Sequence, residues 1–465
     1  MSYHKRIIDK YLEEWAKSDA HKPVLLRGAR QVGKSTAVRH LGERFSNYVE
    51  INFEKQPEYK ALFQDNLDVR RIVPLMEAMC GKPIREGTTL LFLDEIQACP
   101  EAIMSLRFFK EDMSGLHVIA AGSLLEFALE ELPTFGVGRI HSMFMYAMTF
   151  DEFLEANGEI LLMEARNRCS ANSPLTKPLH DRLVQTLRIY ILVGGMPEVV
   201  DKWVETNDFL KCQEIQDDLV TSYEDDFPKY RKKVSPELLR SVMRSAAAQT
   251  TQKFVYSQVG DNYKTKEIKQ AVDMLTLAGI LIPVTHTEAN GLPLGSEEDE
   301  AYRKMMLLDT GIMLRLLNLS IGNMTQITKD ILTSSETELV NKGPMAEMVA
   351  GLELLRYQSP NIRHKMFYWT RQAKNSIAEI DYVTSHISNI LPIEVKAETQ
   401  GGMKSLWIFM REKKISDAIR CSLENFGEFD YTDKLADNAV RHVTICPLYA
   451  ISCLNMMMNG ERNSL

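Results

Sequence analysis

Short apolar runs alternate with helix-like stretches over the first 150 residues of the chain. Apolar runs such as TLLFL and HVIAA are typical of strands buried inside a sheet. Strands that alternate with helices predict a parallel sheet covered by helices on both faces. The expected strands are Pro23–Leu26, Tyr48–Phe53, Thr89–Leu93, His117–Ala121 and Ile140–Met145, and the expected helices are Lys34–Arg44, Asp68–Cys80 and Glu101–Asp112.

The pattern changes twice further along the chain. From Thr149, a plausible N-cap, to about Leu332 it is mainly helical, with Ser170–Pro178 and His286–Glu300 expected as loops. From about Lys342 it is again mixed, which predicts a second α/β segment. The expected elements there are the helix Pro344–Tyr357 and the strands Lys365–Thr370, Ile377–Thr384 and Ile390–Lys396. We therefore predict an α/β protein with domains at residues 1–150, 151–332 and 333–465.

Composition narrows the class of protein. The chain has 465 residues, and its 55 Lys+Arg against 63 Asp+Glu give a net charge of −8. Hydrophobic residues at 45% and charged residues at 25% exclude a mainly disordered or collagen-like chain. The seven cysteines include no CxxC pair, which favours a reducing compartment. Because no run reaches the ~18 apolar residues of a membrane span and the N-terminus is unlike a signal peptide, we expect a cytoplasmic protein without membrane contact.

A phosphate-binding motif follows the first expected strand. Residues 28–35 read GARQVGKS, which fits G-x-x-x-x-G-K-[ST] between a strand and a helix. Gly28 and Gly33 allow backbone angles that turn the loop into an anion nest at the start of a helix. Lys34 would bring a positive charge to the β- and γ-phosphates, and Ser35 a hydroxyl to Mg²⁺. The predicted cofactors are ATP and Mg²⁺, and the predicted binding residues are Gly28, Ala29, Arg30, Gln31, Val32, Gly33, Lys34, Ser35 and Thr36.

A second motif, LLFLDE at residues 90–95, carries two carboxylates to the end of a buried strand. Asp94 would hold Mg²⁺ through water, and Glu95 would orient or deprotonate the attacking water. Ser123, after the fourth strand, is expected either to sense the γ-phosphate or to act only as a cap. Arg139 is expected either to reach a phosphate or to form an ordinary surface salt bridge.

These motifs together resemble the AAA+ superfamily ATPases of bacteria and archaea. The similarity is carried by LLRGARQVGKST at 25–36, LLFLDEIQ at 90–97, IAAGSLL at 119–125 and TFDEFL at 149–154. GGMPEVV at 194–200 and LLDTGIMLRLL at 307–317 resemble the group that pairs a P-loop domain with a C-terminal domain of unknown function. The resemblance implies a sheet of the AAA+ type and ATP as the nucleotide.

The middle of the chain carries a basic segment. Residues 229–269 contain ten Lys/Arg and three Asp/Glu. The expected helix Lys264–Ala278 begins near the end of this segment and precedes an expected strand, Ile280–Thr285, and a polar loop. This succession suggests a winged helix, as the family resemblance also implies. Such a segment is expected either to contact DNA phosphates or to form the solvated face of a helical lid domain.

Acidic residues gather on the expected strands of the C-terminal segment. Asp381 lies in EIDYV, while Glu394 and Lys396 lie two positions apart in PIEVK and so point to one face of a strand. This pattern resembles the restriction-endonuclease-like PD-(D/E)XK fold. The resemblance makes Glu347, Asp381 and Glu394 candidate metal ligands and Lys396 a candidate catalytic lysine. The alternatives are salt-bridged sheet ends, or a nuclease fold kept only for binding.

Two functions follow as hypotheses. In the first, the chain is a P-loop ATPase that hydrolyses Mg·ATP, docks nucleic acid or a partner through its middle domain, and carries a nuclease-like C-terminal domain. In the second, it is a nucleotide-gated interaction module with little turnover and an inactive nuclease fold.

Overall fold

The computed structural model describes residues 3–132, 138–230, 234–318, 342–373, 376–397, 402–436 and 438–460. The chain forms two compact units. Unit 1 consists of Met1–Met148, Met274–Ile280 and Gln358–Arg363, and unit 2 consists of the remaining residues. The expected domain limit at residues 332 and 333 lies outside the described residues, and the three expected domains stay predictions.

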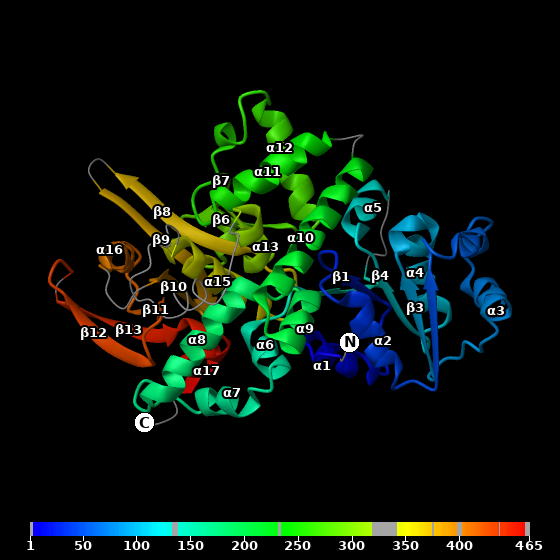
Figure 1. Ribbon diagram of the computed structural model, residues 1–465, viewed down its shortest axis with the longest axis horizontal. Coiled ribbons are helices and arrows are strands. Elements are labelled where there is room, and N and C mark those ends of the chain that lie inside the picture. The colour runs from blue at the N-terminus through cyan, green and yellow to red at the C-terminus, as the bar shows by residue number, and fades with distance from the viewer. Residues whose placement is uncertain are drawn as a thin grey trace. The chain divides into compact units, whose positions relative to one another are not determined.

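Unit 1 is built on a five-stranded parallel sheet in the order β2-β3-β4-β1-β5 (Figure 1). The central strands β3 and β4 are buried along their whole length, as their apolar runs predict. The prediction of an α/β fold with a parallel sheet flanked by helices is confirmed. The strands are β1 (Val24–Arg27), β2 (Asn47–Asn52), β3 (Thr89–Asp94), β4 (His117–Ala121) and β5 (His141–Phe144). The helices are α1 (Ile7–Ala16), α2 (Lys34–Gly42), α3 (Val69–Cys80), α4 (Pro100–Asp112) and α5 (Leu125–Glu131).

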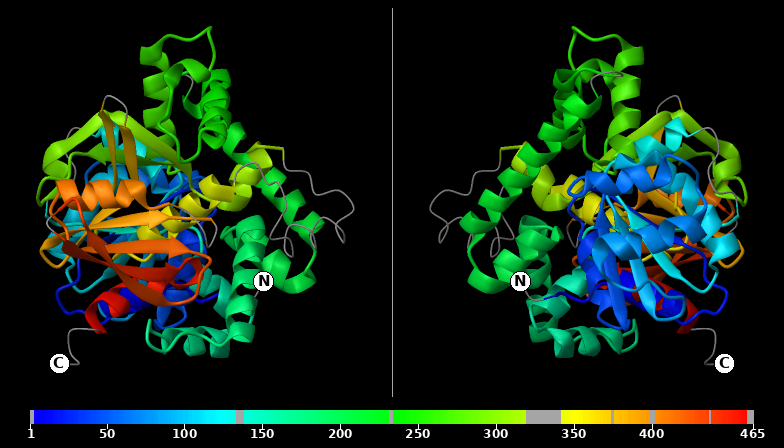
Figure 2. Two further views of the ribbon diagram at one scale, coloured as in Figure 1. Left: turned by 90° about the vertical axis from the view of Figure 1, so that its left-hand side faces the viewer. Right: turned by 90° about the vertical axis from the view of Figure 1, so that its right-hand side faces the viewer.

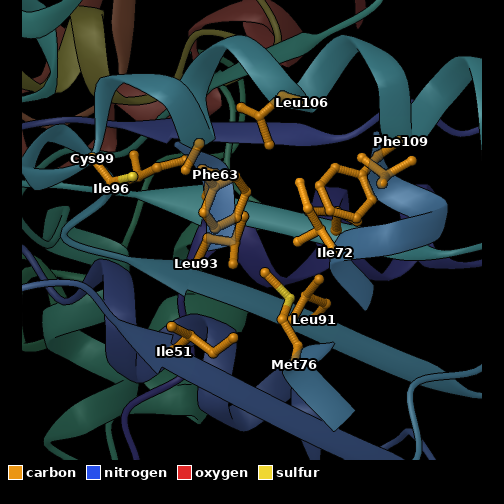
Figure 3. Close-up of a cluster of buried hydrophobic side chains, with 14 of the residues drawn as sticks. Ile51, Phe63, Ile72, Met76, Leu91, Leu93, Ile96, Cys99, Leu106 and Phe109 are labelled. Atoms are coloured by element: carbon orange, nitrogen blue, oxygen red, sulfur yellow. The ribbon is translucent and has the colours of Figure 1, made fainter. Parts of the chain in front are cut away.

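One hydrophobic cluster joins the sheet of unit 1 to its helices (Figure 3). Leu91 and Leu93 from β3 meet Ile72 of α3 and Leu106 of α4, and all four side chains are fully buried. At about 25 cal/mol per Å² of buried apolar area, such side chains supply the main energy that holds the sheet against its helices. The cluster thereby fixes the end of β3, where the carboxylate motif begins.

Unit 2 begins with helices. Thr149 caps the first of them, as expected, because its side chain accepts a hydrogen bond from the Glu152 N–H and the Glu152 carboxylate accepts one from the Thr149 N–H. The last turn of α12, from Met274, belongs to unit 1. The helices are α6 (Phe150–Ala156), α7 (Ile160–Asn167), α8 (Lys177–Val193), α9 (Pro197–Thr206), α10 (Phe209–Asp226), α11 (Pro236–Ala248), α12 (Thr265–Leu277), α13 (Thr310–Leu316), α15 (Lys342–Arg356), α16 (Lys404–Glu412) and α17 (Leu454–Gly460).

An eight-stranded mixed sheet fills the rest of unit 2, in the order β12-β13-β11-β10-β9-β8-β6-β7. The antiparallel pair β12 and β13 forms one end and is drawn in orange to red in Figure 1 and Figure 2. The antiparallel pair β6 and β7 forms the other end. The strands are β6 (Leu281–Thr287), β7 (Glu298–Leu307), β8 (Met366–Ala373), β9 (Ser376–His386), β10 (Asn389–Val395), β11 (Asp417–Ser422), β12 (Gly427–Asp433) and β13 (Ala439–Pro447).

The predicted bounds of the loop at His286–Glu300 are wrong at both ends. β6 continues to Thr287, and β7 already begins at Glu298, where its ladder pairs Thr287 with Glu298. The polar start of β7 resembles a loop in sequence, but it lies at the sheet edge, where polar side chains reach solvent while the backbone stays paired.

Among the described residues, no helix is both long and apolar enough to cross a membrane. The expected cytoplasmic location stays a prediction.

A buried arginine ties several segments of unit 2 together. Arg166 of α7 has a fully buried side chain that donates to both carboxylate oxygens of Asp151, at 2.5 and 2.9 Å, and to the Tyr449 carbonyl at 2.8 Å. Its removal leaves the Asp151 carboxylate and a buried carbonyl without their partner, which is the costly case for a buried ion pair.

We expect Arg166→Met to lower the free energy of unfolding by about 3 kcal/mol, because it removes one partner of this buried pair. Arg182→Met is the matched control, since Arg182 is exposed and its pair with Glu159 is a surface pair worth less than about 1 kcal/mol. Urea titrations of the two variants measure the difference. Equal losses would contradict the importance of burial at Arg166.

Candidate functional site

The loop between β1 and α2 has the backbone that a phosphate nest requires. Gly28, Gln31 and Gly33 have positive φ angles of 141°, 63° and 97°. A Cβ at position 28 would lie 2.1 Å from the carbonyl oxygen of Met145, so only glycine fits there. Gly33 is the N-cap of α2, and the loop therefore ends at the positive pole of a helix.

Lys34 points into this loop. Its side chain is 7% exposed, and its Nζ donates hydrogen bonds to the carbonyls of Gly28 at 2.7 Å and Ala29 at 2.6 Å. Burial lowers the pKa of the Lys34 ammonium to about 8, although the charges of Glu95 and Asp94 oppose the shift. The hydrogen bonds described for the ammonium go to neutral carbonyl oxygens, so an anion bound in the loop would stabilise its charge.

The carboxylate of Asp94 joins two neighbouring segments at the end of β3. Its Oδ1 accepts a hydrogen bond from Ser35 Oγ at 3.1 Å, and its Oδ2 accepts one from Asn52 Nδ2 at 3.1 Å. Burial, followed by the charge of Glu95, raises the pKa of Asp94. Hydroxyl and carboxylate oxygens are the ligands that Mg²⁺ prefers, so Ser35 and Asp94 fit this ion.

Glu95 is held in a strained and restrained position. Its backbone has φ 48°, unusual for a residue other than glycine. One carboxylate oxygen, Oε2, accepts hydrogen bonds from Gln97 Nε2 at 2.7 Å and from both the N–H and Oγ of Ser123 at 3.3 Å. A Cβ at Gly122 would lie 1.9 Å from Gln97 Oε1, so the glycine makes room for this arrangement. Ser123 thus lies beside the second carboxylate.

The other predicted residues of unit 1 lie as follows. Ala29 and Val32 are buried, Arg30 is half-buried, and Gln31 and Thr36 are exposed. Arg139 is exposed and forms a salt bridge with Glu111, at 3.2 Å. This is the surface pairing considered above for Arg139, and the roles of all these residues toward a nucleotide stay predictions.

Sequence reasoning missed three residues around the loop. Arg6 donates hydrogen bonds to the carbonyls of Val32 at 2.8 Å and Tyr146 at 2.7 Å. Gly279 lies against the loop, since a Cβ there would be 3.3 Å from the Cα of Ala29. No motif marks either residue. Asn52 lies near the end of the expected strand Tyr48–Phe53, but only the structure places this strand beside the one that carries Asp94.

Of the predicted C-terminal residues, Glu347 lies on α15, Asp381 on β9 and Glu394 on β10 of unit 2, and Lys396 follows β10 directly. Lys396 Nζ donates to Glu394 Oε1 at 2.5 Å, and the Val395 N–H donates to Asp381 Oδ2 at 2.7 Å. Glu347 instead pairs with a lysine that the sequence analysis did not consider, Lys304 of β7, at 2.8 Å.

Burial dominates the electrostatics of this cluster. Burial and the charge of Asp381 raise the pKa of Glu347 to about 8 and that of Glu394 to about 7. Burial alone would lower the pKa of Lys304, but the charges of Glu347, Asp381 and Glu379 outweigh it and raise the pKa. Among the residues that the structure describes, no group of three or more histidine, cysteine, aspartate or glutamate side chains is arranged to hold a metal ion.

Much of the basic segment 229–269 is already paired. Arg240 and Arg244 both contact Glu224, and Lys229 contacts Asp226 at 2.7 Å. Glu224 and Asp226, just upstream in the chain, therefore neutralise part of the segment. The lysines that stay exposed at the start of α12 are Lys264, Lys266 and Lys269, and residues 231–233 lie outside the described part of the chain.

Comparison with known proteins gives three partial family matches. Residues 20–154 match a family model described as an AAA domain. Residues 184–321 and 342–447 match two further models, each described as a domain of unknown function (DUF8612 and DUF4143). No curated protein matches the chain.

Two solved structures show weak similarity. One is unliganded Pif1 from Bacteroides sp, with 16% identity, 39% of this chain and 49% of that chain covered, and a TM-score of 0.19. The chain thus spans about half the length of that protein. The other is Drosophila ORC bound to DNA, with 13% identity, coverage of 67% and 85%, and a TM-score of 0.24. Both TM-scores are low, and neither similarity carries an argument here.

The AAA family match and the parallel sheet that carries the glycine loop agree. Unit 1 contains a P-loop domain of the AAA type, which implies nucleotide binding.

Proposed function

We propose that unit 1 binds Mg·ATP and hydrolyses it. The observation that carries the proposal is the hydrogen bond from Ser35 at the start of α2 to Asp94 at the end of β3, at 3.1 Å. This contact joins the loop that would hold phosphates to the carboxylate that would position the metal. Magnesium bound there would neutralise charge on the phosphates.

Each side chain has a defined part in this proposal. Lys34 binds the β- and γ-phosphates, and the nest formed by residues 28–33 binds them through its N–H groups. Glu95 orients the attacking water and accepts its proton. Ser123 shares its hydroxyl between Glu95 and the γ-phosphate. Arg139, paired with Glu111, is given no role in this proposal, and its expected contact with a phosphate stays a prediction.

The restraint on Glu95 favours a second candidate function. One Glu95 oxygen already accepts hydrogen bonds from Gln97 and Ser123, so fewer of its lone pairs remain to orient a water molecule. A chain that binds ATP tightly but turns it over slowly would act as a nucleotide-gated interaction module. Turnover and nucleotide affinity of the purified chain separate the two candidates.

We also propose that the start of α12 contacts nucleic acid. The support is the pair of exposed lysines Lys264 and Lys266. Lys269 is also exposed, but its Nζ lies 5.7 Å from the centre of the Tyr256 ring, and the other described arginines and lysines of the segment have acidic or aromatic partners. Gly279, two residues after α12, lies against Ala29 of the phosphate loop. A change in the phosphate loop on nucleotide binding would therefore act on the backbone next to the end of α12. The alternative is a solvated helix face.

Cleavage of nucleic acid by the C-terminal cluster is not part of this proposal. Glu347, Asp381, Glu394 and Lys396 remain candidates from the resemblance alone.

Lys34→Ala should reduce ATP turnover by at least about a hundredfold, because it removes the positive charge that stabilises the transferred phosphoryl group. Lys22→Ala is the matched control, since Lys22 is an exposed lysine just before β1. Phosphate release measures turnover, and circular dichroism verifies folding. Normal turnover in the folded Lys34→Ala variant would refute the assignment.

Nucleotide affinity should depend on pH through Lys34. The ammonium is charged below its pKa of about 8 and neutral above it. Binding of an anion favours the charged form, so above pH 8 binding must take up a proton. The affinity should then fall by up to about tenfold per pH unit. Calorimetry in buffers of different ionisation enthalpy measures the proton uptake. Lys34→Arg stays charged and should show a flat profile; a flat profile in the unmodified chain would contradict the prediction.

Affinity for DNA should fall steeply with salt if the exposed lysines meet phosphates. Each phosphate contact contributes a slope of about −0.9 in log affinity against log salt, so Lys264→Ala/Lys266→Ala should make the slope shallower by about 2. Lys229→Ala is the control, since Lys229 is already paired with Asp226. Fluorescence anisotropy with a labelled duplex gives the slopes. No binding at low salt, or equal slopes in both variants, would reject the contact.

A further inference from the structure

Lys304 of β7 is a buried lysine with two carboxylate partners. Its side chain is 1% exposed, and its Nζ lies 2.8 Å from Glu347 Oε1 of α15 and 2.7 Å from Glu379 Oε1 of β9. The Tyr368 ring lies 5.0 Å from the same ammonium. A buried charge costs several kcal/mol unless it is paired, so this ammonium is compensated by the cluster around it.

The candidate metal ligands of the C-terminal segment each have one oxygen already occupied. Glu347 accepts from Lys304, Asp381 accepts from the Val395 N–H, and Glu394 accepts from Lys396. A divalent ion needs several oxygens at 2.0 to 2.6 Å. An ammonium 2.8 Å from Glu347 would lie directly beside such an ion and repel it. The side chains as arranged therefore do not fit the metal that the nuclease resemblance implies.

The same cluster nevertheless holds more carboxyl groups than ammonium groups. Glu347, Glu379, Asp381 and Glu394 face only Lys304 and Lys396, and burial together with the charge of Asp381 raises the pKa of Glu347 and of Glu394. Glu394 is 4% exposed, and its Oε2 is buried without a hydrogen-bond partner. A buried oxygen without a partner points to a group that the cluster is built to accept.

We propose that Lys304 is a built-in substitute for the divalent cation. Its ammonium forms ion pairs with Glu347 and Glu379, and the cluster accepts a divalent metal ion only when that ammonium is removed. The unmodified chain then has no metal-dependent nuclease centre in unit 2. The cluster serves instead to tie β7 to α15 and β9. This inference is independent of the proposed ATPase function, because it concerns unit 2 without nucleotide.

The test measures Mn²⁺ binding without nucleotide, by calorimetry and by electron paramagnetic resonance. Lys304→Met replaces the ammonium by an apolar group of similar length. This variant should bind a single Mn²⁺ ion per chain that the unmodified chain does not bind, and millimolar Mn²⁺ should raise its melting temperature by about 3 °C. Adding Asp381→Asn should abolish both effects. Lys365→Met is the matched control, since Lys365 forms an exposed pair with Glu298, and it should gain no site.

Two results would overturn the proposal. One is a Mn²⁺ site on the unmodified chain that Asp381→Asn alone removes. The other is a folded Lys304→Met variant that gains no Mn²⁺ binding. Should Lys304→Met fail to fold, the comparison of the unmodified chain with Asp381→Asn decides: equal Mn²⁺ binding supports the proposal, and a site lost with Asp381 rejects it. A failure of ATP turnover in unit 1 changes none of these results.

Discussion

A buried ammonium must be compensated by negative charge, and both candidate sites depend on how this constraint is met. Lys34 and Lys304 are almost equally buried, at 7% and 1% exposed. Lys34 has carbonyl oxygens as its direct partners, and burial lowers its pKa to about 8. Lys304 has two carboxylates in contact, and its pKa is raised. The first lysine is therefore ready to receive an anion, while the second has its anions within the fold.

The sequence was sufficient to predict the framework of unit 1 because its central strands are buried on both faces. Such strands are continuous apolar runs, and β1, β3 and β4 were predicted within about a residue or two of their observed ends. The position of β4 between β1 and β3 was not readable, since chain order does not give sheet order. That order brings Ser123 to Glu95, which explains why this contact was not predicted.

The burial of polar residues could not be predicted where it depends on residues far away in the chain. The stretch that forms β7 begins EDEAYRK, and a lysine in such a stretch normally reaches solvent. Lys304 is buried only because Glu347 and Glu379, more than 40 positions away in the chain, converge on it. The parallel pairing of β6 with β8 is equally non-local and places strands from both sides of residue 332 in one sheet. Local periodicity contains no information about such pairings.

Gly279 has no reactive side chain, yet its position restricts the phosphate loop. It has φ 72°, and a side chain there would meet the backbone of Ala29 at 3.2 Å. The loop of residues 28–33 is thus enclosed by two backbone contacts, Met145 at Gly28 and Gly279 at Ala29. Any shift of the loop on binding phosphates must move one of them. Because Gly279 lies two residues after the end of α12, a shift of the loop would displace the backbone just beyond this helix.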